Sequence, residues 1–423
     1  MSNKFNKEFF VHFLAVFSGK VGASGLGFIV SLAVARLLGP ENFGLFSFFL
    51  MWALLGSCFI GDIFADAMIR NYSVSIQNNK NHASSVLLNA LLIRLFFGTL
   101  LAVTGALLSN YIALEIFNNE DYTIPIMYGC AGALAISLWT FILSMLQASE
   151  AFHKHGLISP LVNLLRLIAI PILFNIGMFA VEPLIMVFVA SYVICGVTAI
   201  FLMRGRFKDG KILYPEIKKQ LSFSKWITLS LICIALINFL AIPALGYYAT
   251  NLEVGLYAAG ANLLIVFEHI TNAIVTIQYP KISKLKTLHE LRSFNWKTLK
   301  FSIVIVALLA PLIYFIKPFI ILVYGAEYAA SSLIFQVLCI GLLSTMITQP
   351  LNLLFLVQNK SHYWGYMSLI SLCIWIIAGY ILIPQYAAIG AATATLIARV
   401  SYSFISSILL WKTLRPKKEL NLS

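Results

Sequence analysis

Charged residues are scarce in this sequence: Asp, Glu, Lys and Arg make up 11% of its 423 residues, whereas hydrophobic residues make up 60%. An ordinary globular domain is about 25% charged and ~45–50% apolar. So little polar surface excludes a soluble enzyme of this length. With 25 glycines, 13 prolines and 6 cysteines, the chain is also not collagenous, disordered or disulfide-rich. The remaining class is an integral membrane protein with little mass outside the bilayer.

Motifs that hold metals and nucleotides are missing as well. The six cysteines stand singly inside apolar runs, without a CxxC pair or a Cys/His spacing typical of zinc sites. The sequence has no GxxxxGK[ST] loop for ATP phosphates and no HExxH helix. No long outer connection carries the clustered Asp, Glu and His residues of an extramembrane active site. We therefore expect no metal, no cofactor and no enzymatic activity.

Twelve apolar runs of 20–27 residues are each long enough to cross a bilayer, which takes about 20 residues in a helix. Backbone polar groups cannot stay unpaired in lipid, so these runs are helices or closed-barrel strands. Barrel strands alternate over about 10 residues, so the length of the runs indicates helices. We predict an all-α membrane protein with twelve transmembrane helices at 10–35, 44–66, 84–108, 123–147, 157–179, 184–203, 226–248, 256–279, 299–323, 331–357, 363–383 and 389–411.

Lysine and arginine are distributed unevenly between the two sides of these spans. With both termini placed inside, 23 of the 29 basic residues fall in inner segments, and only Arg36 and Lys317 fall in outer ones. Cytoplasmic connections of membrane proteins carry such an excess. We therefore expect both termini in the cytoplasm. The net charge of +13 then reflects topology and contact with anionic headgroups, and not nucleic-acid binding.

The two halves of the sequence resemble each other. At an offset of 211 residues, PENFGLFS (40–47) aligns with NLEVGLYA (251–258), and Gly44-Leu45 aligns with Gly255-Leu256. Six spans per half mean that both halves insert the same way up, as in transporters built from a parallel repeat. We predict two pseudo-symmetric six-helix lobes, 1–210 and 211–423, with a site between them near the midplane.

Four basic residues lie about ten residues inside predicted spans, and therefore near mid-bilayer: Lys20, Arg94, Arg166 and Arg399. A charge that faces lipid at this depth costs about 2.5–3.5 kcal/mol, so we expect all four to face protein or water. Any one of them could be an interhelical ion-pair partner. Together they outnumber the acids at the same depth, and this excess favours a cationic cavity that binds an anion such as pyrophosphate.

Acidic residues inside the spans are fewer. Glu268 lies near the middle of its span, where it either pairs with a basic residue or binds H⁺ or Na⁺. Asp62 and Asp66 lie one helical turn apart toward the inner end of the second span. With Arg36 and Arg70, these acids are our candidates for coupling or gating residues.

Several segments are similar to a known family. They are ARLLGPENFGLFSF (35–48), GDIFADAMIRNYS (61–73), EVGLYAAGANLL (253–264), QYPKIS (278–283) and LVYGAEYAASSLIF (322–335). They resemble the corresponding segments of polysaccharide flippases, which move O-antigen or capsule repeat units and belong to the multidrug/oligosaccharidyl-lipid/polysaccharide exporter superfamily. The resemblance covers the whole chain, and its motifs mark the family better than the substrate.

The resemblance implies a MATE-like, two-lobed bundle and alternating access. It also implies transport of an undecaprenyl-pyrophosphate-linked oligosaccharide from the cytoplasmic to the outer leaflet of the bacterial cell membrane. Family members carry basic residues in a central cavity, which agrees with the four intramembrane cations by depth. The expected partners are the lipid-linked oligosaccharide, membrane lipids, a coupling H⁺ or Na⁺, and a polysaccharide polymerase.

Two other functions stay open at this point. A cation-coupled multidrug exporter of the same superfamily would use Glu268 as its coupling acid, although such exporters rely on acids within their spans and the charges here are mostly basic. A membrane-embedded glycosyltransferase or polysaccharide polymerase would form product without transport. Lipid II flippases of the superfamily commonly have fourteen spans, whereas twelve are predicted here.

Overall fold

The computed structural model describes residues 2–414 except 79, 209, 214–224, 283, 284, 286 and 359. It gives the backbone alone at residues 2–18, 20, 21, 62, 66, 77, 78, 80, 225, 273, 276, 277, 279–281, 288, 312 and 356. The described residues form helices and turns, and no strand occurs among them. They divide into two compact units, Met1–Lys225 with Thr250–Gly255, and Trp226–Ala249 with Leu256–Ser423.

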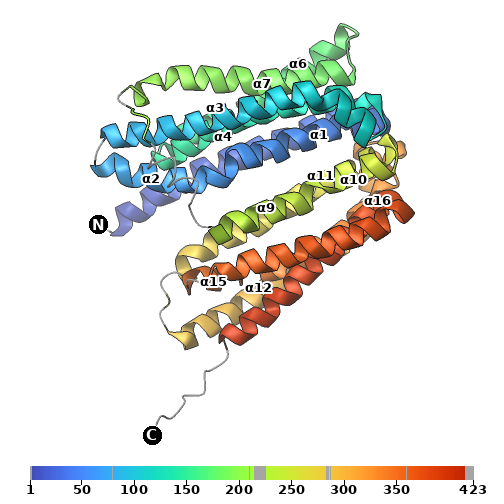
Figure 1. The fold of residues 1–423 in the computed structure, drawn as a ribbon. Helices are drawn as coiled ribbons and strands as arrows, with labels where there is room; N and C mark the ends of the chain where they lie inside the picture. Colours follow the sequence, from blue (N-terminus) through green and yellow to red (C-terminus); the bar gives the residue numbers. More distant parts are fainter. Residues whose placement is uncertain are drawn as a thin grey trace. The chain divides into compact units, whose positions relative to one another are not determined.

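The first unit is a bundle around α4, which packs against α1, α3 and α7 (Figure 1). Small residues on α4, among them Gly129, Gly132 and Ala133, are buried and allow the neighbouring helices to approach closely. The helices of this unit are α1 (Ser2–Ile60), α2 (Ala65–Asn78), α3 (Lys80–Tyr111), α4 (Thr123–Ala148), α5 (Phe152–Ile158), α6 (Leu161–Asn175) and α7 (Val181–Leu202).

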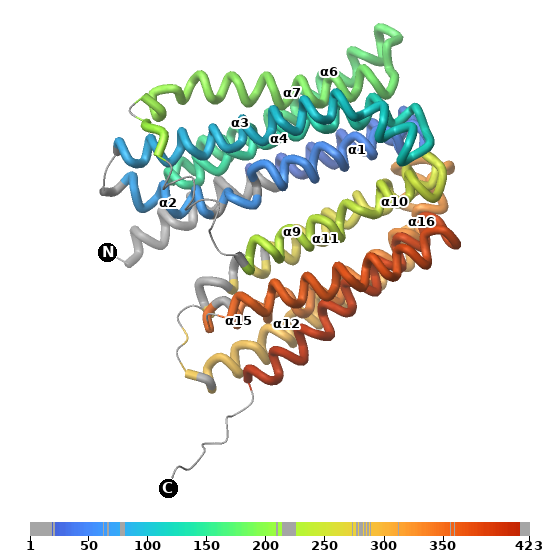
Figure 2. The backbone as a smooth tube through the Cα atoms, viewed as in Figure 1, coloured from blue at the N-terminus to red at the C-terminus, as the bar shows by residue number. Residues whose placement is uncertain are grey.

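The second unit has its main contact between α14 and α16, and consecutive long helices run back and forth through it (Figure 2). Its longest helix, α16, carries buried small and hydroxyl residues along the face toward α14. The first residues of α11, up to Gly255, belong to the first unit. The helices of the second unit are α9 (Lys225–Phe239), α10 (Ala241–Tyr248), α11 (Asn251–Ile282), α12 (Leu288–Tyr314), α13 (Ile316–Val323), α14 (Ser331–Thr348), α15 (Leu353–Val357) and α16 (His362–Leu414).

Twelve membrane crossings follow from the helix lengths. In the described part of the chain, ten helices are long and apolar enough to cross a membrane. The first and the last of these, Gly22–Ile60 and His362–Leu414, have 39 and 53 residues, about twice what one crossing needs. Each is interrupted by one residue with positive φ, Gly39 at 73° and Ala387 at 45°, so each supplies two crossings. The predicted all-α class with twelve spans is confirmed.

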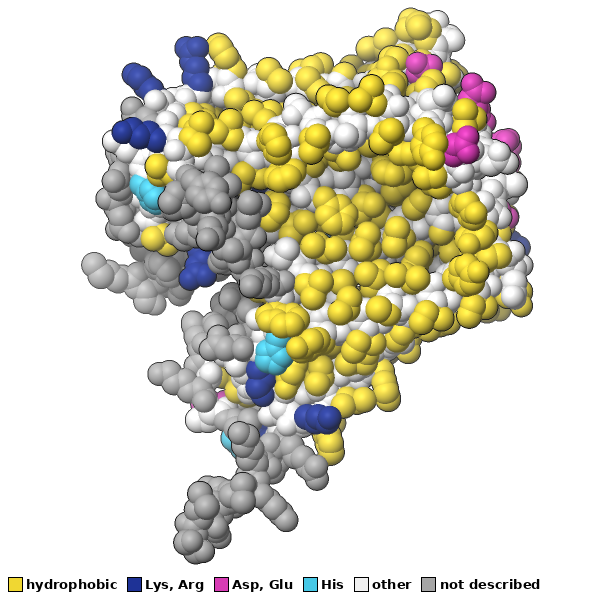
Figure 3. Space-filling view, in the orientation of Figure 1, with side chains coloured by type: hydrophobic (Ala, Val, Ile, Leu, Met, Phe, Trp, Pro, Cys, Tyr) yellow, Lys and Arg dark blue, Asp and Glu magenta, His cyan; other side chains and the backbone are white. Residues whose placement is uncertain are grey.

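Apolar side chains cover most of the described surface in the view of Figure 3, as contact with lipid requires. Leu107, Leu202 and Tyr380 are each about three-quarters exposed. In the first unit, exposed acids lie where α3 ends and α4 and α7 begin, whereas exposed basic residues such as Lys154 and Arg204 lie at the opposite helix ends. The sides of this unit are therefore built to face hydrocarbon, and its charged side chains lie toward its two ends.

The connection between the two halves of the sequence begins as part of the first unit. The backbone N–H of Lys211 donates to Ser85 Oγ at 3.0 Å. Asn89 on α3 donates to the Lys211 carbonyl at 3.1 Å and accepts from the Leu213 N–H at 3.2 Å. Asn89 is fully buried, so its amide, and not water, is the hydrogen-bond partner of the Lys211 carbonyl and the Leu213 N–H.

The repeated glycines found in the sequence lie against each other. A Cβ built on Gly44 would overlap the Asn251 carbonyl oxygen and lie 3.1 Å from the Gly255 nitrogen. A Cβ built on Gly255 would overlap the Pro40 carbonyl oxygen and lie 3.0 Å from the Gly44 nitrogen. The offset of 211 residues relates Pro40 to Asn251 and Gly44 to Gly255, so the contact is reciprocal. All four residues belong to the first compact unit.

Tyr122 holds the start of α11 in this contact. Its hydroxyl donates to Asn251 Oδ1 at 2.6 Å. Its ring stacks on Phe48 with centroids 4.0 Å apart, and it meets Phe117 edge to face. Because the ring is fixed on two sides, the hydroxyl is held in place to bind the asparagine.

Alanine at either glycine should destabilise the protein, because two backbones meet there and neither can move aside as a side chain can. We expect Gly44→Ala and Gly255→Ala each to lower the free energy of unfolding by about 1–3 kcal/mol. The double variant should lose less than the sum, because separating the two segments relieves both overlaps. Thermal and denaturant unfolding of the detergent-purified protein measures all three.

Gly25→Ala is the matched control, since Gly25 is exposed on α1 and a Cβ there would meet no described atom within 4 Å. It should be neutral or slightly stabilising. Unchanged stability of Gly44→Ala and Gly255→Ala, or a fully additive double variant, would contradict the reciprocal contact.

Candidate functional site

Arg94 is enclosed in the interior of the first unit, with 1% of its surface exposed. Its Nη2 donates to the Gly61 carbonyl at 3.0 Å, and its Nη1 donates to the Ala90 carbonyl at 3.3 Å. The guanidinium also lies 5.2 Å from the centre of the Phe141 ring. The predicted intramembrane position is thus occupied by a cation that faces protein. The Gly61 carbonyl joins α3 to the end of α1 through it, whereas the Ala90 carbonyl belongs to α3 itself.

Arg166 on α6 is also buried, at 5% exposure. Its three nitrogens reach three different oxygens: Nε donates to Ser191 Oγ at 3.0 Å, Nη1 to Asn163 Oδ1 at 3.2 Å and Nη2 to the Phe188 carbonyl at 3.2 Å. The rings of Phe188 and Tyr192 lie 3.9 and 4.4 Å from its central carbon. This arrangement uses the planar fork of arginine and ties α6 to α7.

The remaining predicted residues of the first unit are described less fully. Lys20 lies on α1, and the side chains of Lys20, Asp62 and Asp66 fall outside the described residues. Arg36 and Arg70 are exposed, on α1 and α2. The described contacts of Arg94 and Arg166 are made to different groups, so a shared cavity for the four cations stays a prediction.

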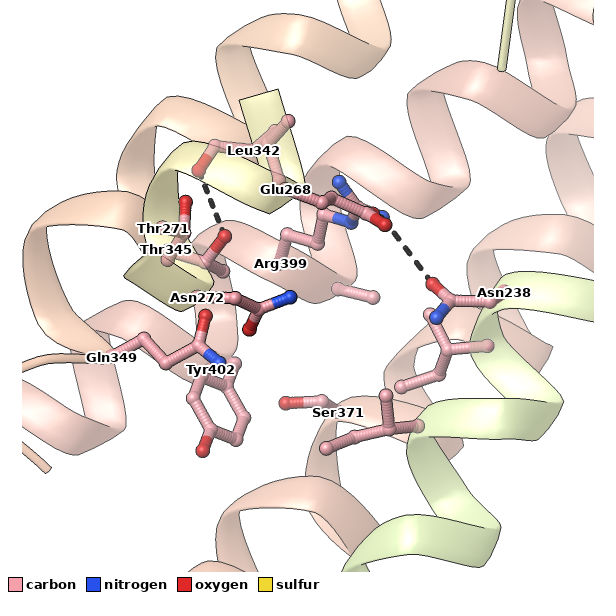
Figure 4. A pocket seen from close by; sticks show the side chains of 13 residues that line it. Asn238, Glu268, Thr271, Asn272, Leu342, Thr345, Gln349, Ser371, Arg399 and Tyr402 are labelled. Carbon is pink, nitrogen blue, oxygen red and sulfur yellow. Dashed lines mark hydrogen bonds and ion pairs between the residues drawn. The ribbon is translucent and has the colours of Figure 1, made fainter. Parts of the chain in front are cut away.

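A pocket of about 260 Å³ lies inside the second unit, among α9, α11, α14 and α16 (Figure 4). It contains two of the predicted site residues, Glu268 and Arg399. Nine of its thirteen lining residues carry a polar side-chain group, and the carbon atoms of the lining residues form most of the wall. The lining residues are Ile234, Ile237, Asn238, Glu268, Thr271, Asn272, Leu342, Thr345, Gln349, Ser371, Ala398, Arg399 and Tyr402.

Glu268 and Arg399 form an ion pair in this pocket. The distance from Arg399 Nη2 to Glu268 Oε1 is 3.4 Å, and the same nitrogen donates to Asn238 Oδ1 at 3.3 Å (Figure 4). The side chains are 14% exposed for Arg399 and 42% for Glu268. The acid thus compensates the charge of one of the four predicted cations, and the pocket holds one charge of each sign.

Four polar residues form a stripe with Arg399 along α16 and serve mainly in packing: Thr395, Tyr402, Ser403 and Ser406. Ser403 accepts a hydrogen bond from Thr348 at 3.2 Å, and Ser406 donates to Asn352 Oδ1 at 2.5 Å. On the preceding turn, Thr395 accepts from Trp375 Nε1 at 3.0 Å. Hydroxyl residues join neighbouring helices in this way inside membranes. Of the stripe, Tyr402 is the member that reaches the pocket.

Of the polar pocket residues, the sequence analysis singled out Glu268 and Arg399, and it missed others, among them Asn238, Gln349 and Ser371. Each is a polar residue in the interior or near the end of an apolar run, which is a usable signal. Thr271 and Asn272 could be found from Glu268, because all three lie on one face of α11. Choosing Asn238 and Ser371 over other polar residues requires knowledge of which helices face each other.

Comparisons with known proteins agree with the resemblance seen in the sequence segments. A family model described as polysaccharide biosynthesis protein matches residues 9–286. An inward-facing multidrug resistance MATE transporter of the MOP superfamily is 13% identical, with 92% of this chain and 94% of that chain covered and a TM-score of 0.76. The lipid II flippase MurJ, in an inward closed conformation, is 16% identical, with 96% and 88% covered and a TM-score of 0.74.

A MOP superfamily transporter from Pyrococcus furiosus is 14% identical, with 95% and 94% covered and a TM-score of 0.64. Comparison with curated protein sequences gives no match. At these identities the structural likeness establishes the fold, which is that of MOP superfamily transporters.

Arg166→Lys should destabilise the protein although it keeps the charge. A lysine ammonium cannot reach three oxygens in the positions that Nε, Nη1 and Nη2 occupy, and it lacks the planar face that stacks on Phe188 and Tyr192. We expect a loss of about 1.5–3 kcal/mol in the free energy of unfolding, which is typical of a lost hydrogen bond to a charged group. Denaturation of the purified protein in detergent measures it.

The control is Arg204→Lys, an exposed arginine that lies 4.8 Å from the Phe201 ring; we expect a change of less than about 0.5 kcal/mol there. Wild-type stability of Arg166→Lys would show that the charge alone matters at that position.

Proposed function

Because the chain belongs to the polysaccharide biosynthesis protein family, we propose that it is a flippase for lipid-linked oligosaccharides. Its substrate is an undecaprenyl-pyrophosphate-linked repeat unit for O-antigen, capsule or exopolysaccharide. The protein moves this unit from the cytoplasmic to the outer leaflet by alternating access. The observation that carries the proposal is the family match over residues 9–286, and the MOP transporter fold supports it.

The apolar and polar parts of the cargo need different surroundings during transport. The polyprenyl tail stays in hydrocarbon along the exposed apolar faces of the helices, because it gains nothing by leaving lipid. The pyrophosphate and glycan need a polar path. We propose Lys20, Arg94, Arg166 and Arg399 as the cations that make this path favourable for pyrophosphate. For Arg94 and Arg166 this role requires that the anion replaces protein acceptors they now bind.

We place the protein in the bacterial cell membrane with both termini in the cytoplasm, which follows from the excess of basic residues in the predicted inner segments. Arg36, Arg70, Asp62 and Asp66 lie at or near span ends and remain the proposed gating residues. A polysaccharide polymerase on the outer side would consume the transported unit.

A cation-coupled multidrug exporter is the second candidate, and the acid Glu268 inside the second unit favours it. Such an exporter needs an acid that is free to bind a cationic drug. Glu268 already faces Arg399 at 3.4 Å. This pairing supports a site for polar cargo more than one for organic cations. Uptake of cationic dyes compared with uptake of lipid-linked oligosaccharide separates the two functions.

Transport in proteoliposomes should respond to a membrane potential without ATP. Moving one charge across the membrane is worth about 2.3 kcal/mol per 100 mV. A pyrophosphate diester carries about two negative charges, so an inside-negative potential of this size favours outward movement by about 4–5 kcal/mol. Exposure of the glycan to an impermeant lectin measures the transport. Movement that ignores the potential and requires ATP would reject the mechanism.

Glu268→Gln should change the ion dependence of transport. We propose that Glu268 binds H⁺ or Na⁺ in the return step, after the cargo has left. Arg399 contacts one oxygen of this carboxylate, Oε1. The amide cannot take up a proton or hold a cation with a full charge. The variant should therefore lose its response to an imposed pH or Na⁺ gradient and keep its response to the potential. Glu327→Gln, an exposed acid on a short turn, is the control; an unchanged ion dependence in Glu268→Gln assigns that residue to packing.

A further inference from the structure

Two buried polar atoms at the pocket of the second unit have no hydrogen-bond partner among the described residues. Ser371 on α16 is 1% exposed, and its Oγ has no hydrogen-bond partner among the described residues. The same holds for Nη1 of Arg399. Both side chains line the pocket, and the Ser371 hydroxyl is directed into it (Figure 4). Buried polar atoms are normally paired, so this pair of atoms indicates a ligand with hydrogen-bonding groups.

The charges of the pocket indicate that this ligand is uncharged. Arg399 and Glu268 lie 3.4 Å apart, and each compensates the other. An incoming anion would meet the Glu268 carboxylate, and an incoming cation would meet the guanidinium. A pyrophosphate or a uronic acid is therefore disfavoured here relative to a neutral polyol.

The size and the wall chemistry fit a sugar ring. A volume of about 260 Å³ is close to the lower end of the range for small-molecule sites, ~300–1,000 Å³. It is large enough for a sugar ring and too small for a whole repeat unit. A sugar hydroxyl both donates and accepts, so it can pair with the Ser371 hydroxyl, with Arg399 Nη1 and with the amides of Asn238 and Gln349. The ring of Tyr402 offers an apolar face for the C–H groups of a pyranose.

We infer that this pocket binds a neutral sugar of the transported glycan, a hexose or an N-acetylhexosamine, and rejects uronic acids. The inference rests on the proposed flippase function for the identity of the cargo. It assigns Arg399 to the glycan instead of the pyrophosphate, and leaves Lys20, Arg94 and Arg166 as the cations proposed for pyrophosphate. Ser371 and Arg399 Nη1 are its polar anchors.

Binding of free sugars tests the pocket without transport. Saturation-transfer NMR on the purified full-length protein would use glucose, galactose, N-acetylglucosamine and glucuronic acid at equal concentration. We expect at least one of the three neutral sugars to bind, and glucuronic acid to bind more weakly. Equal or stronger binding of glucuronic acid, or no binding by any neutral sugar, overturns the inference.

Two serines on α16 provide matched variants. Ser371→Ala removes a hydroxyl without a described partner, so the melting temperature should not change. The affinity for the sugar should fall about two- to tenfold, which is the effect of one hydrogen bond. Ser368→Ala removes a buried hydroxyl that bonds to Ser230 Oγ at 2.7 Å, so it should lower the melting temperature and keep the sugar affinity. Wild-type sugar affinity in Ser371→Ala would overturn the assignment.

Lipid probes separate this inference from the proposed function. Ser371→Leu fills the pocket, so it should weaken binding of an undecaprenyl-pyrophosphate-linked N-acetylglucosamine and leave binding of sugar-free undecaprenyl pyrophosphate unchanged. An equal loss of affinity for both lipids would show that the pocket does not bind the sugar. If free sugar binds through Ser371 while no lipid-linked oligosaccharide is transported, the flippase proposal fails and the pocket assignment stands.

Discussion

Hydrocarbon offers no hydrogen bonds, and this constraint determines most of the fold. Every backbone group inside the membrane must find its partner in its own segment, so the described spans are all helical. Side chains obey the same rule. Ser406 donates a hydrogen bond to Asn352, and Thr395 accepts one from Trp375. Asn89 donates to the backbone of the connection between the halves. These polar residues therefore join segments that are distant in the sequence, whereas others, such as Thr99 and Thr104, bond to the backbone of their own helix.

The buried cations divide into two kinds when their partners are compared. Arg94 and Arg166 bind backbone carbonyls and amide or hydroxyl oxygens, and aromatic rings lie against them. Arg399 instead meets a carboxylate at the wall of a pocket and keeps one nitrogen unpaired among the described residues. A charge enclosed by protein dipoles stabilises a packing arrangement, whereas a charge at a pocket wall with a spare donor is available to a ligand. Equal depth in the bilayer does not imply equal roles.

Hydropathy predicted the twelve crossings because lipid selects length and composition directly. The same pattern placed the turns of α1 and α16 in the gaps 36–43 and 384–388, which contain Gly39 and Ala387. It did not predict that Ala387 takes the positive φ, because that residue is not a glycine. The Glu268–Arg399 pair joins residues 131 positions apart, so the sequence could name both residues and leave their pairing open. Ser371 could not be distinguished from other serines in the spans, because only the packing of the helices determines that its hydroxyl lines the pocket without a described partner.

The reciprocal packing of Gly44 and Gly255 bears on the ancestry of the chain. If a six-span ancestor formed a homodimer of parallel subunits, its single glycine would have met its own copy across an exact two-fold axis. One mutation at that position would then have placed a side chain on both sides of the same contact, because both subunits carry it. Gene duplication and fusion separate the two sites, so each can change alone, yet each still meets the other's backbone. Selection on one repeat therefore still depends on the residue in the other, long after most of the two halves have diverged.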